Sequence, residues 1–146
     1  MSQGMFKTFQ DLEVWQAARD LRRNIYALTR QLPDNEKYNL VSQMQRAALS
    51  LTNNIAEGHG RYGYQENIQF LRQARGSLEE LVDDLTLCAD ENYRPAVELM
   101  AIENEIGRVR ALLNGYIRYL KERKQSSLST LRETSPAFDS DEGDTL

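Results

Sequence analysis

Apolar residues recur at alternating steps of three and four positions in four separate segments of this chain. A repeat of about 3.5 residues places such positions on one side of an α-helix and is typical of antiparallel helices that pack at small crossing angles. Each segment therefore predicts one helix with a buried seam. The seams are Val14, Ala18, Leu21, Ile25, Leu28 and Leu32; Val41, Met44, Ala48, Leu51 and Ile55; Leu71, Ala74, Leu78, Leu81, Leu85 and Cys88; and Leu99, Ile102, Ile106, Val109, Leu113, Tyr116 and Leu120.

Helix-breaking residues separate the four seams. Pro33 ends the first helix, and Asp34 after it can cap the second. Three glycines within residues 58–63 disfavour a stable helix there, and Pro95 suits the first turn of the last helix. Because the connections are short, successive helices run antiparallel. We therefore predict an all-α fold, an antiparallel up-down-up-down four-helix bundle over residues 9–125. Its predicted helices are 9–32, 35–57, 64–90 and 95–123.

The two ends of the chain differ from this pattern. Residues 1–8 form a short N-terminal extension, and residues 126–146 are rich in Ser, Thr, Asp and Glu. Residues 1–125 carry 17 basic and 17 acidic side chains, so the net charge of −4 comes from the last 21 residues. Such a segment cannot bury enough apolar surface to offset the entropy of ordering, and we expect a disordered acidic tail.

The chain offers little for catalysis, metal binding or a membrane. Its only cysteine, Cys88, excludes an intrachain disulfide, and its only histidine, His59, lies in the glycine segment without metal-ligand spacing. We expect no catalytic residues, no metal and no cofactor. The chain has neither a visible signal peptide nor a run of apolar residues long enough to cross a bilayer. We expect a soluble, cytoplasmic protein with no membrane contact.

A row of polar residues accompanies the second seam. Arg46, Ser50, Asn54 and Glu57 are spaced to share one helical face. We expect Glu57 to anchor an arginine and Asn54 to cap or bridge near the glycines, with a small residue in the third helix allowing close approach. This structural polar signature is Arg46, Asn54, Glu57, Gly58, Gly76 and Ser77. A hydrogen-bonded network that fixes helix register or a subunit contact is one interpretation, and a ligand or nucleic-acid role is the other.

Arginine outnumbers lysine 14 to 4, which suits contacts with phosphate. Acidic residues are interleaved with these arginines, so solvated ion pairs are the alternative. The candidate nucleic-acid-binding residues are Arg19, Arg22, Arg23, Arg46, Arg61, Arg72, Arg75, Arg118 and Lys121.

Further apolar residues lie beside or away from the seams. Some widen the core stripe, but together they indicate a second apolar surface and hence self-association. They are Leu12, Trp15, Tyr26, Leu40, Leu49, Phe70, Val82, Leu87, Met100, Leu112, Ile117 and Tyr119.

Several short motifs, taken together, resemble one family. They are LEVWQAA from Leu12, IYALT from Ile25, LPDNE from Leu32, QMQRAA from Gln43, NIAEG from Asn54 through Arg61, and FL from Phe70 with ARGSLEEL from Ala74. Over about residues 9–123 the chain resembles the four-helix-bundle proteins encoded in intervening sequences of bacterial 23S ribosomal RNA genes. Gln45 departs from that family's pattern, because a second basic residue usually precedes the arginine at position 46.

The resemblance implies an antiparallel four-helix bundle, a ring-like homopentamer and no established enzymatic activity. It also implies a structural relationship to the accessory protein of diversity-generating retroelements, which works with a reverse transcriptase. We therefore expect a non-enzymatic, homo-oligomeric interaction module that binds RNA or a nucleoprotein partner such as a reverse transcriptase. The alternative is a scaffold that binds a protein partner without affinity for nucleic acid.

Overall fold

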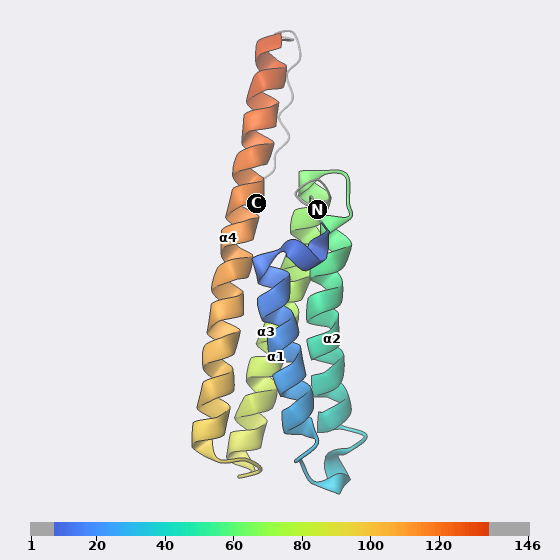
Figure 1. The fold of residues 1–146 in the computed structure, drawn as a ribbon, viewed down its shortest axis with the longest axis vertical. Helices are drawn as coiled ribbons and strands as arrows, with labels where there is room; N and C mark the ends of the chain where they lie inside the picture. Colours follow the sequence, from blue (N-terminus) through green and yellow to red (C-terminus); the bar gives the residue numbers. More distant parts are fainter. Residues whose placement is uncertain (1–7, 135–146) are drawn as a thin grey trace.

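The computed structural model describes residues 8–134, which form four antiparallel α-helices and two short 3-10 turns (Figure 1). The predicted all-α four-helix bundle is confirmed, and residues 8–134 contain no strand. The elements are η2 Phe9–Asp11, α1 Glu13–Thr29, η3 Asp34–Glu36, α2 Leu40–His59, α3 Tyr64–Asp90 and α4 Ala96–Thr134.

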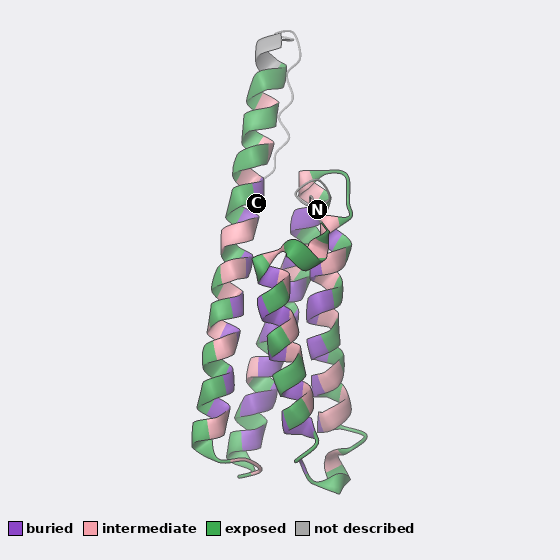
Figure 2. Cartoon of the chain, viewed as in Figure 1, coloured by how far each residue is buried: buried purple, intermediate pink, exposed green. Residues whose placement is uncertain are grey.

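Each helix packs against two others. α2 lies between α1 and α3, and α4 closes the bundle by contacting α3 and α1. The seams predicted from the sequence line the interior (Figure 2). Leu21, Met44, Leu78 and Leu113, one from each helix, are all fully buried. None of the four helices in residues 8–134 is long and apolar enough to span a bilayer.

α1 and α2 begin later than predicted, because 3-10 turns precede them. Thr8 caps the first turn by accepting a hydrogen bond from the Gln10 backbone N–H. After Pro33 the chain makes the Asp34–Glu36 turn instead of entering α2, so Asp34 does not cap that helix. The Glu36 side chain takes this role, because its Oε1 accepts a bond of 3.4 Å from the Leu40 backbone N–H.

α2 continues past the first glycine of the 58–63 segment, contrary to the prediction that this segment is not helical. It includes Gly58 and His59 and ends where Gly60 forms the C-cap. Gly58 is buried against α3. Tight packing between the two helices therefore outweighs the low helix propensity of glycine at this position.

α4 is longer than predicted and reaches Thr134. Residues 126–134, which the composition assigned to the tail, are helical. Residues 124–134 contain neither proline nor glycine, so nothing in that stretch breaks a helix that is already nucleated. The end of α4 projects past the α2–α3 connection (Figure 1). The rest of the predicted tail, 135–146, and residues 1–7 of the N-terminal extension lie outside the described residues.

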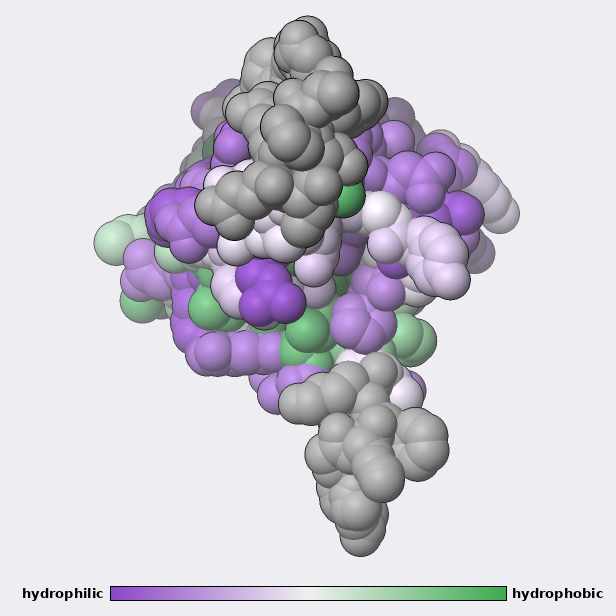
Figure 3. Space-filling model, turned by 90° about the horizontal axis from the view of Figure 1, so that it is seen from above, coloured by the Kyte–Doolittle hydropathy of each residue, from purple (hydrophilic) through white to green (hydrophobic). Residues whose placement is uncertain are grey.

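Most of the apolar residues outside the seams belong to the core. Leu40 and Ile117 are buried, and Leu12, Trp15, Tyr26, Val82 and Leu112 pack against the core from its edge. Exposed side chains among them are Leu49, Leu87, Met100 and Tyr119. Viewed along the bundle, hydrophobic residues on the visible face are interspersed with hydrophilic ones (Figure 3). Phe70 is half-buried, and Val97, which the sequence analysis did not include, is exposed as well.

Candidate nucleic-acid interface

Eight of the nine predicted nucleic-acid-binding residues are spread over the four helices, and the ninth, Arg61, lies in the α2–α3 connection. Arg19, Arg22 and Arg23 are on α1, and Arg46 is on α2. Arg72 and Arg75 belong to α3, whereas Arg118 and Lys121 belong to α4. Because each helix contacts two neighbours, these residues are distributed around the whole bundle.

Several of these arginines brace the bundle. The Arg22 Nη1 atom donates a hydrogen bond of 2.8 Å to the buried Thr52 hydroxyl, which ties α1 to α2. Arg75 donates to Asn114 at 2.7 Å and ties α3 to α4. Arg19 lies over the Trp15 ring, with its guanidinium carbon 5.4 Å from the ring centroid. These interactions take up part of the hydrogen-bonding capacity that phosphate would need.

Three arginines meet in a hollow on α1. The hollow measures about 430 Å³ and is lined by Arg22, Arg23, Asn24, Tyr26 and Arg30. Arg23 and Arg30 are exposed, and Arg22 is half-buried by its bond to α2. The last two turns of α1 and its C-cap residue Arg30 therefore concentrate three guanidinium groups beside an aromatic ring.

A second hollow adjoins the first where α1 meets the start of α2. It measures about 450 Å³ and is lined by Tyr26, Lys37, Tyr38, Val41, Ser42, Gln45, Arg46 and Leu49. Tyr26 lines both hollows, so they are neighbours. Among the described residues, no acidic side chain lines either one. We call this surface the α1–α2 basic face; it comprises Arg22, Arg23, Tyr26, Arg30, Lys37, Tyr38 and Arg46.

The sequence pattern predicted only part of this face. Arg30, Lys37 and Tyr38 are not among the predicted site residues. Lys37 and Tyr38 lie in the connection that leads into α2, and connections carry no periodicity from which a face can be assigned. The available signal was the Lys37-Tyr38 pair itself, a basic residue next to an aromatic one in an exposed segment.

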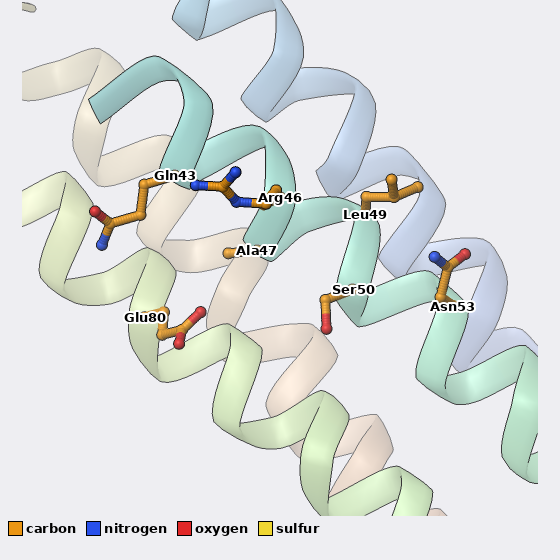
Figure 4. Close-up of a pocket in the computed structure, with 7 residues that line it drawn as sticks. All are labelled: Gln43, Arg46, Ala47, Leu49, Ser50, Asn53 and Glu80. Carbon is orange, nitrogen blue, oxygen red and sulfur yellow. The ribbon is translucent and has the colours of Figure 1, made fainter. Parts of the chain in front are cut away.

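A third hollow lies between α2 and α3 and has mixed charge (Figure 4). It measures about 560 Å³ and is lined by Gln43, Arg46, Ala47, Leu49, Ser50, Asn53 and Glu80. Arg46 and Leu49 line this hollow as well as the second one, so they form a ridge between the two. The carboxylate of Glu80 makes the third hollow less suited to an anion than the α1–α2 basic face.

The structure does not bring the polar signature together: Arg46 lies on the ridge between the hollows, and the other polar side chains form two separate groups. Ser77 on α3 donates a bond of 3.0 Å to the Ser50 hydroxyl on α2. Asn54 donates to the same hydroxyl at 3.1 Å and to the Ser50 carbonyl at 2.9 Å. Asn54 therefore bonds one turn back along α2, whereas the sequence had placed it at the glycine segment. This network links α2 to α3 through buried or half-buried hydroxyls.

Glu57 belongs to the other group, at the end of α2. Its Oε2 accepts a bond of 2.8 Å from Arg61, whose guanidinium carbon also lies 4.9 Å from the Phe70 ring centroid. The Glu57 side chain is 56% exposed, so water screens the pair.

The glycine that allows close helix approach is Gly58. A Cβ atom there would stand 3.0 Å from the Phe70 Cβ and 3.1 Å from the Asn67 carbonyl oxygen. A Cβ built on Gly76, the candidate from the sequence, meets open space and no side chain of a neighbouring helix. Its neighbour Ser77 is the residue that faces α2.

One buried carboxyl is hydrogen-bonded to Gln43, a residue that lines the third hollow. Asp84 on α3 is 2% exposed, and its Oδ1 accepts a bond of 3.2 Å from Gln43. Its Oδ2 is buried and has no hydrogen-bond partner. Burial, with added repulsion from Asp83 and Glu80, raises the pKa of Asp84 to about 6. Burial also raises the pKa of the Cys88 thiol to about 11, so this cysteine is a neutral core residue at physiological pH.

Residues 8–134 contain no group of three or more His, Cys, Asp or Glu side chains placed to hold a metal ion. The arrangement on the α1–α2 basic face is suited to binding an anionic surface.

Comparison with known proteins places the chain in a structural context. The family model for 23S rRNA-intervening sequence protein matches residues 10–115. A similar solved structure is a protein of unknown function from the S23 ribosomal protein family of Bacteroides thetaiotaomicron. It has a TM-score of 0.67 and 22% sequence identity, and the match covers 71% of this chain and 97% of that chain. At this identity the likeness establishes the fold. No curated protein matches the chain significantly.

Proposed function

The chain belongs to the 23S rRNA-intervening sequence protein family, and we propose that it binds RNA through the α1–α2 basic face without catalysing a reaction. One observation carries the proposal. Two adjoining hollows gather five basic residues and two tyrosines, and no acidic side chain of the described residues lines them. Such a combination of guanidinium, ammonium and aromatic groups suits a phosphate backbone with accessible bases.

Binding of this kind depends on local charge. The whole chain carries a net charge of −4, so there is no long-range attraction to an anionic polymer. The contacts must come from the basic residues of the α1–α2 basic face. Because these contacts release counterions, affinity falls with added salt, by a log–log slope of about −0.7 for each phosphate contact on a single strand.

The proposal includes self-association and a cytoplasmic location. A ring-like homopentamer would present the α1–α2 basic face five times, and weak contacts would then add through avidity. The exposed apolar residues available for a subunit contact include Leu49, Leu87 and Met100. RNA in a nucleoprotein, such as one with a reverse transcriptase, would meet the same surface as free RNA.

The experiment compares two triple variants of the full-length protein in their affinity for a labelled RNA. Arg23, Arg30 and Arg46 on the α1–α2 basic face are changed to Gln in the first variant. Arg72, Arg108 and Arg118 on α3 and α4 are changed to Gln in the matched control, which has the same net charge. We expect the first variant to lose at least about tenfold in affinity and to reduce the salt slope by about 2. The control should stay within about twofold of the parent protein.

Equal losses in both variants would show that overall charge, and not this face, determines binding. No measurable RNA binding by the parent protein would reject the proposal and favour a scaffold whose partner is a protein.

A further inference from the structure

We infer that the second hollow of the α1–α2 basic face binds an unpaired nucleotide, whose base stacks on the ring of Tyr38. This inference rests on the proposed function and narrows it to single-stranded RNA. The inference requires a contact with a base as well as contacts with phosphates. A surface that binds only phosphates would bind duplex and single-stranded RNA alike.

The exposure of Tyr38 is the first observation. Tyr38 is 88% exposed, although aromatic rings usually bury much of their surface. It lines the second hollow, at the point where the chain enters α2. The Lys37 ammonium lies 5.5 Å from the centroid of the Tyr38 ring. Most of the ring surface is therefore accessible, next to a positive charge.

The other residues of the hollow supply the remaining contacts of a nucleotide. Lys37 and Arg46 can hold the phosphate, while Ser42 and Gln45 offer hydrogen-bonding groups for a base edge. The Gln45 Nε2 donates to the Thr29 hydroxyl at 3.0 Å, and that hydroxyl donates to the Tyr26 carbonyl at 2.8 Å. This chain of bonds holds the Gln45 amide in place before any ligand arrives.

The adjoining hollow extends the site along the strand. This hollow contains three cationic side chains, those of Arg22, Arg23 and Arg30. It contains no second aromatic ring as exposed as that of Tyr38. A strand with one base on Tyr38 would place its neighbouring phosphates against these arginines. In a duplex the bases are stacked on each other, and their faces are out of reach of a side chain. The arrangement therefore favours loops, bulges or single strands.

The test uses the full-length protein and one short labelled RNA, presented as a single strand or annealed to its complement. The variants are Tyr38→Ala, Tyr38→Phe and Tyr62→Ala. Tyr62 is a matched control, because it is 99% exposed and lies in the α2–α3 connection, away from the α1–α2 basic face. Thermal melting of each variant checks the fold, which these exposed positions should leave unchanged.

We expect the parent protein to bind the single strand at least about tenfold more tightly than the duplex. Tyr38→Ala should weaken single-strand binding about 5- to 100-fold, the usual loss for one stacked base, and leave duplex affinity unchanged. Tyr38→Phe keeps the ring and should retain affinity, and Tyr62→Ala should behave as the parent.

Two results would overturn the stacking inference without rejecting the proposed function. They are equal affinity of the parent protein for the two RNA forms, and undiminished affinity of Tyr38→Ala for the single strand. In both cases RNA binding itself, and with it the proposed function, would stand. Failure of the parent protein to bind either form would reject both together.

Discussion

Gly58 on α2 lies so close to Asn67 on α3 that a Cβ atom on Gly58 would stand 2.7 Å from the Asn67 Oδ1 atom. Real Cβ atoms do not approach other heavy atoms this closely. The two helices therefore meet at this point only because residue 58 has no side chain. Asn67 is itself buried, so it has little room to move away.

Gly58→Ala should destabilise the protein by about 1–3 kcal/mol, because the added methyl group forces α2 and α3 apart. The control is Gly76→Ala on α3, where the added Cβ meets open space. That change should stabilise the protein by up to about 1 kcal/mol through helix propensity. Urea unfolding followed by circular dichroism measures both. A Gly58→Ala protein as stable as the parent would contradict the packing described.

Asp84 makes stability depend on pH in a defined direction. Its pKa in the folded protein, about 6, is above its ordinary value of 3.8. The folded state therefore binds the proton more tightly than the unfolded state. The stabilisation is complete below pH 4 and is lost as pH rises toward 6. Asp84→Asn removes this dependence and should raise the free energy of unfolding at pH 7 by roughly 1–2 kcal/mol.

Asp90→Asn is the matched control for this experiment, because Asp90 is an exposed aspartate on the same helix and, unlike Asp83 and Glu80, does not contribute to the raised pKa of Asp84. Its pH profile should follow that of the parent between pH 4 and 7. If Asp84→Asn keeps the parent's pH dependence over this range, another group is responsible.

Glu36 and Tyr93 tie together the two connections at one end of the bundle. The Tyr93 hydroxyl donates a bond of 2.7 Å to the Glu36 carboxylate, which also accepts a bond from Asn39. This bond lowers the pKa of Glu36 and helps to raise the pKa of Tyr93 to about 12. Tyr93→Phe should lower the melting temperature at pH 7, whereas Tyr62→Phe at a fully exposed position should not. If the parent, Tyr93→Phe and Tyr62→Phe all melt at the same temperature, the bond between Tyr93 and Glu36 does not contribute to stability.

Glu57→Ala should change stability by less than about 0.5 kcal/mol. The sequence analysis expected Glu57 to anchor an arginine, and the structure pairs it with Arg61 one turn away. This pair lies at the surface, where exposed ion pairs contribute little to stability. Thermal melting of Glu57→Ala beside the parent measures the difference. A drop of several degrees would indicate a contact with Glu57 outside the bundle, for example in an oligomer.

The sequence predicted the parts of the fold that periodicity determines. Apart from Val41 and Tyr116, which are half-buried, the predicted seam residues are buried as expected. A helix that buries one face has apolar residues at every third or fourth position, and this repeat is visible in the sequence. Periodicity does not say how far a helix continues once its buried face ends, and α4 therefore ran further than predicted. Gly58 and Gly76 look alike in the sequence, and only the packing distance distinguishes them.

The candidate site was harder to predict for a similar reason. Arg22, Arg23 and Arg46 could be named from their residue type, but residue type does not say which arginines meet. The face is completed by Lys37 and Tyr38, whose positions depend on how the chain turns between α1 and α2. The sequence also gave no sign that Asp84 would be buried, because charged residues commonly border an apolar seam.

The most direct test of the account is to map where RNA touches the full-length protein. A single-stranded RNA that carries a photoreactive uridine would be cross-linked to the protein, and the modified peptides identified by mass spectrometry. We predict adducts in the peptides of α1 and early α2, concentrated at Tyr26 and Tyr38, with Tyr62 and Tyr119 unmodified. Adducts concentrated on α3 and α4, or spread evenly over the exposed tyrosines, would contradict the α1–α2 basic face as the RNA-binding surface.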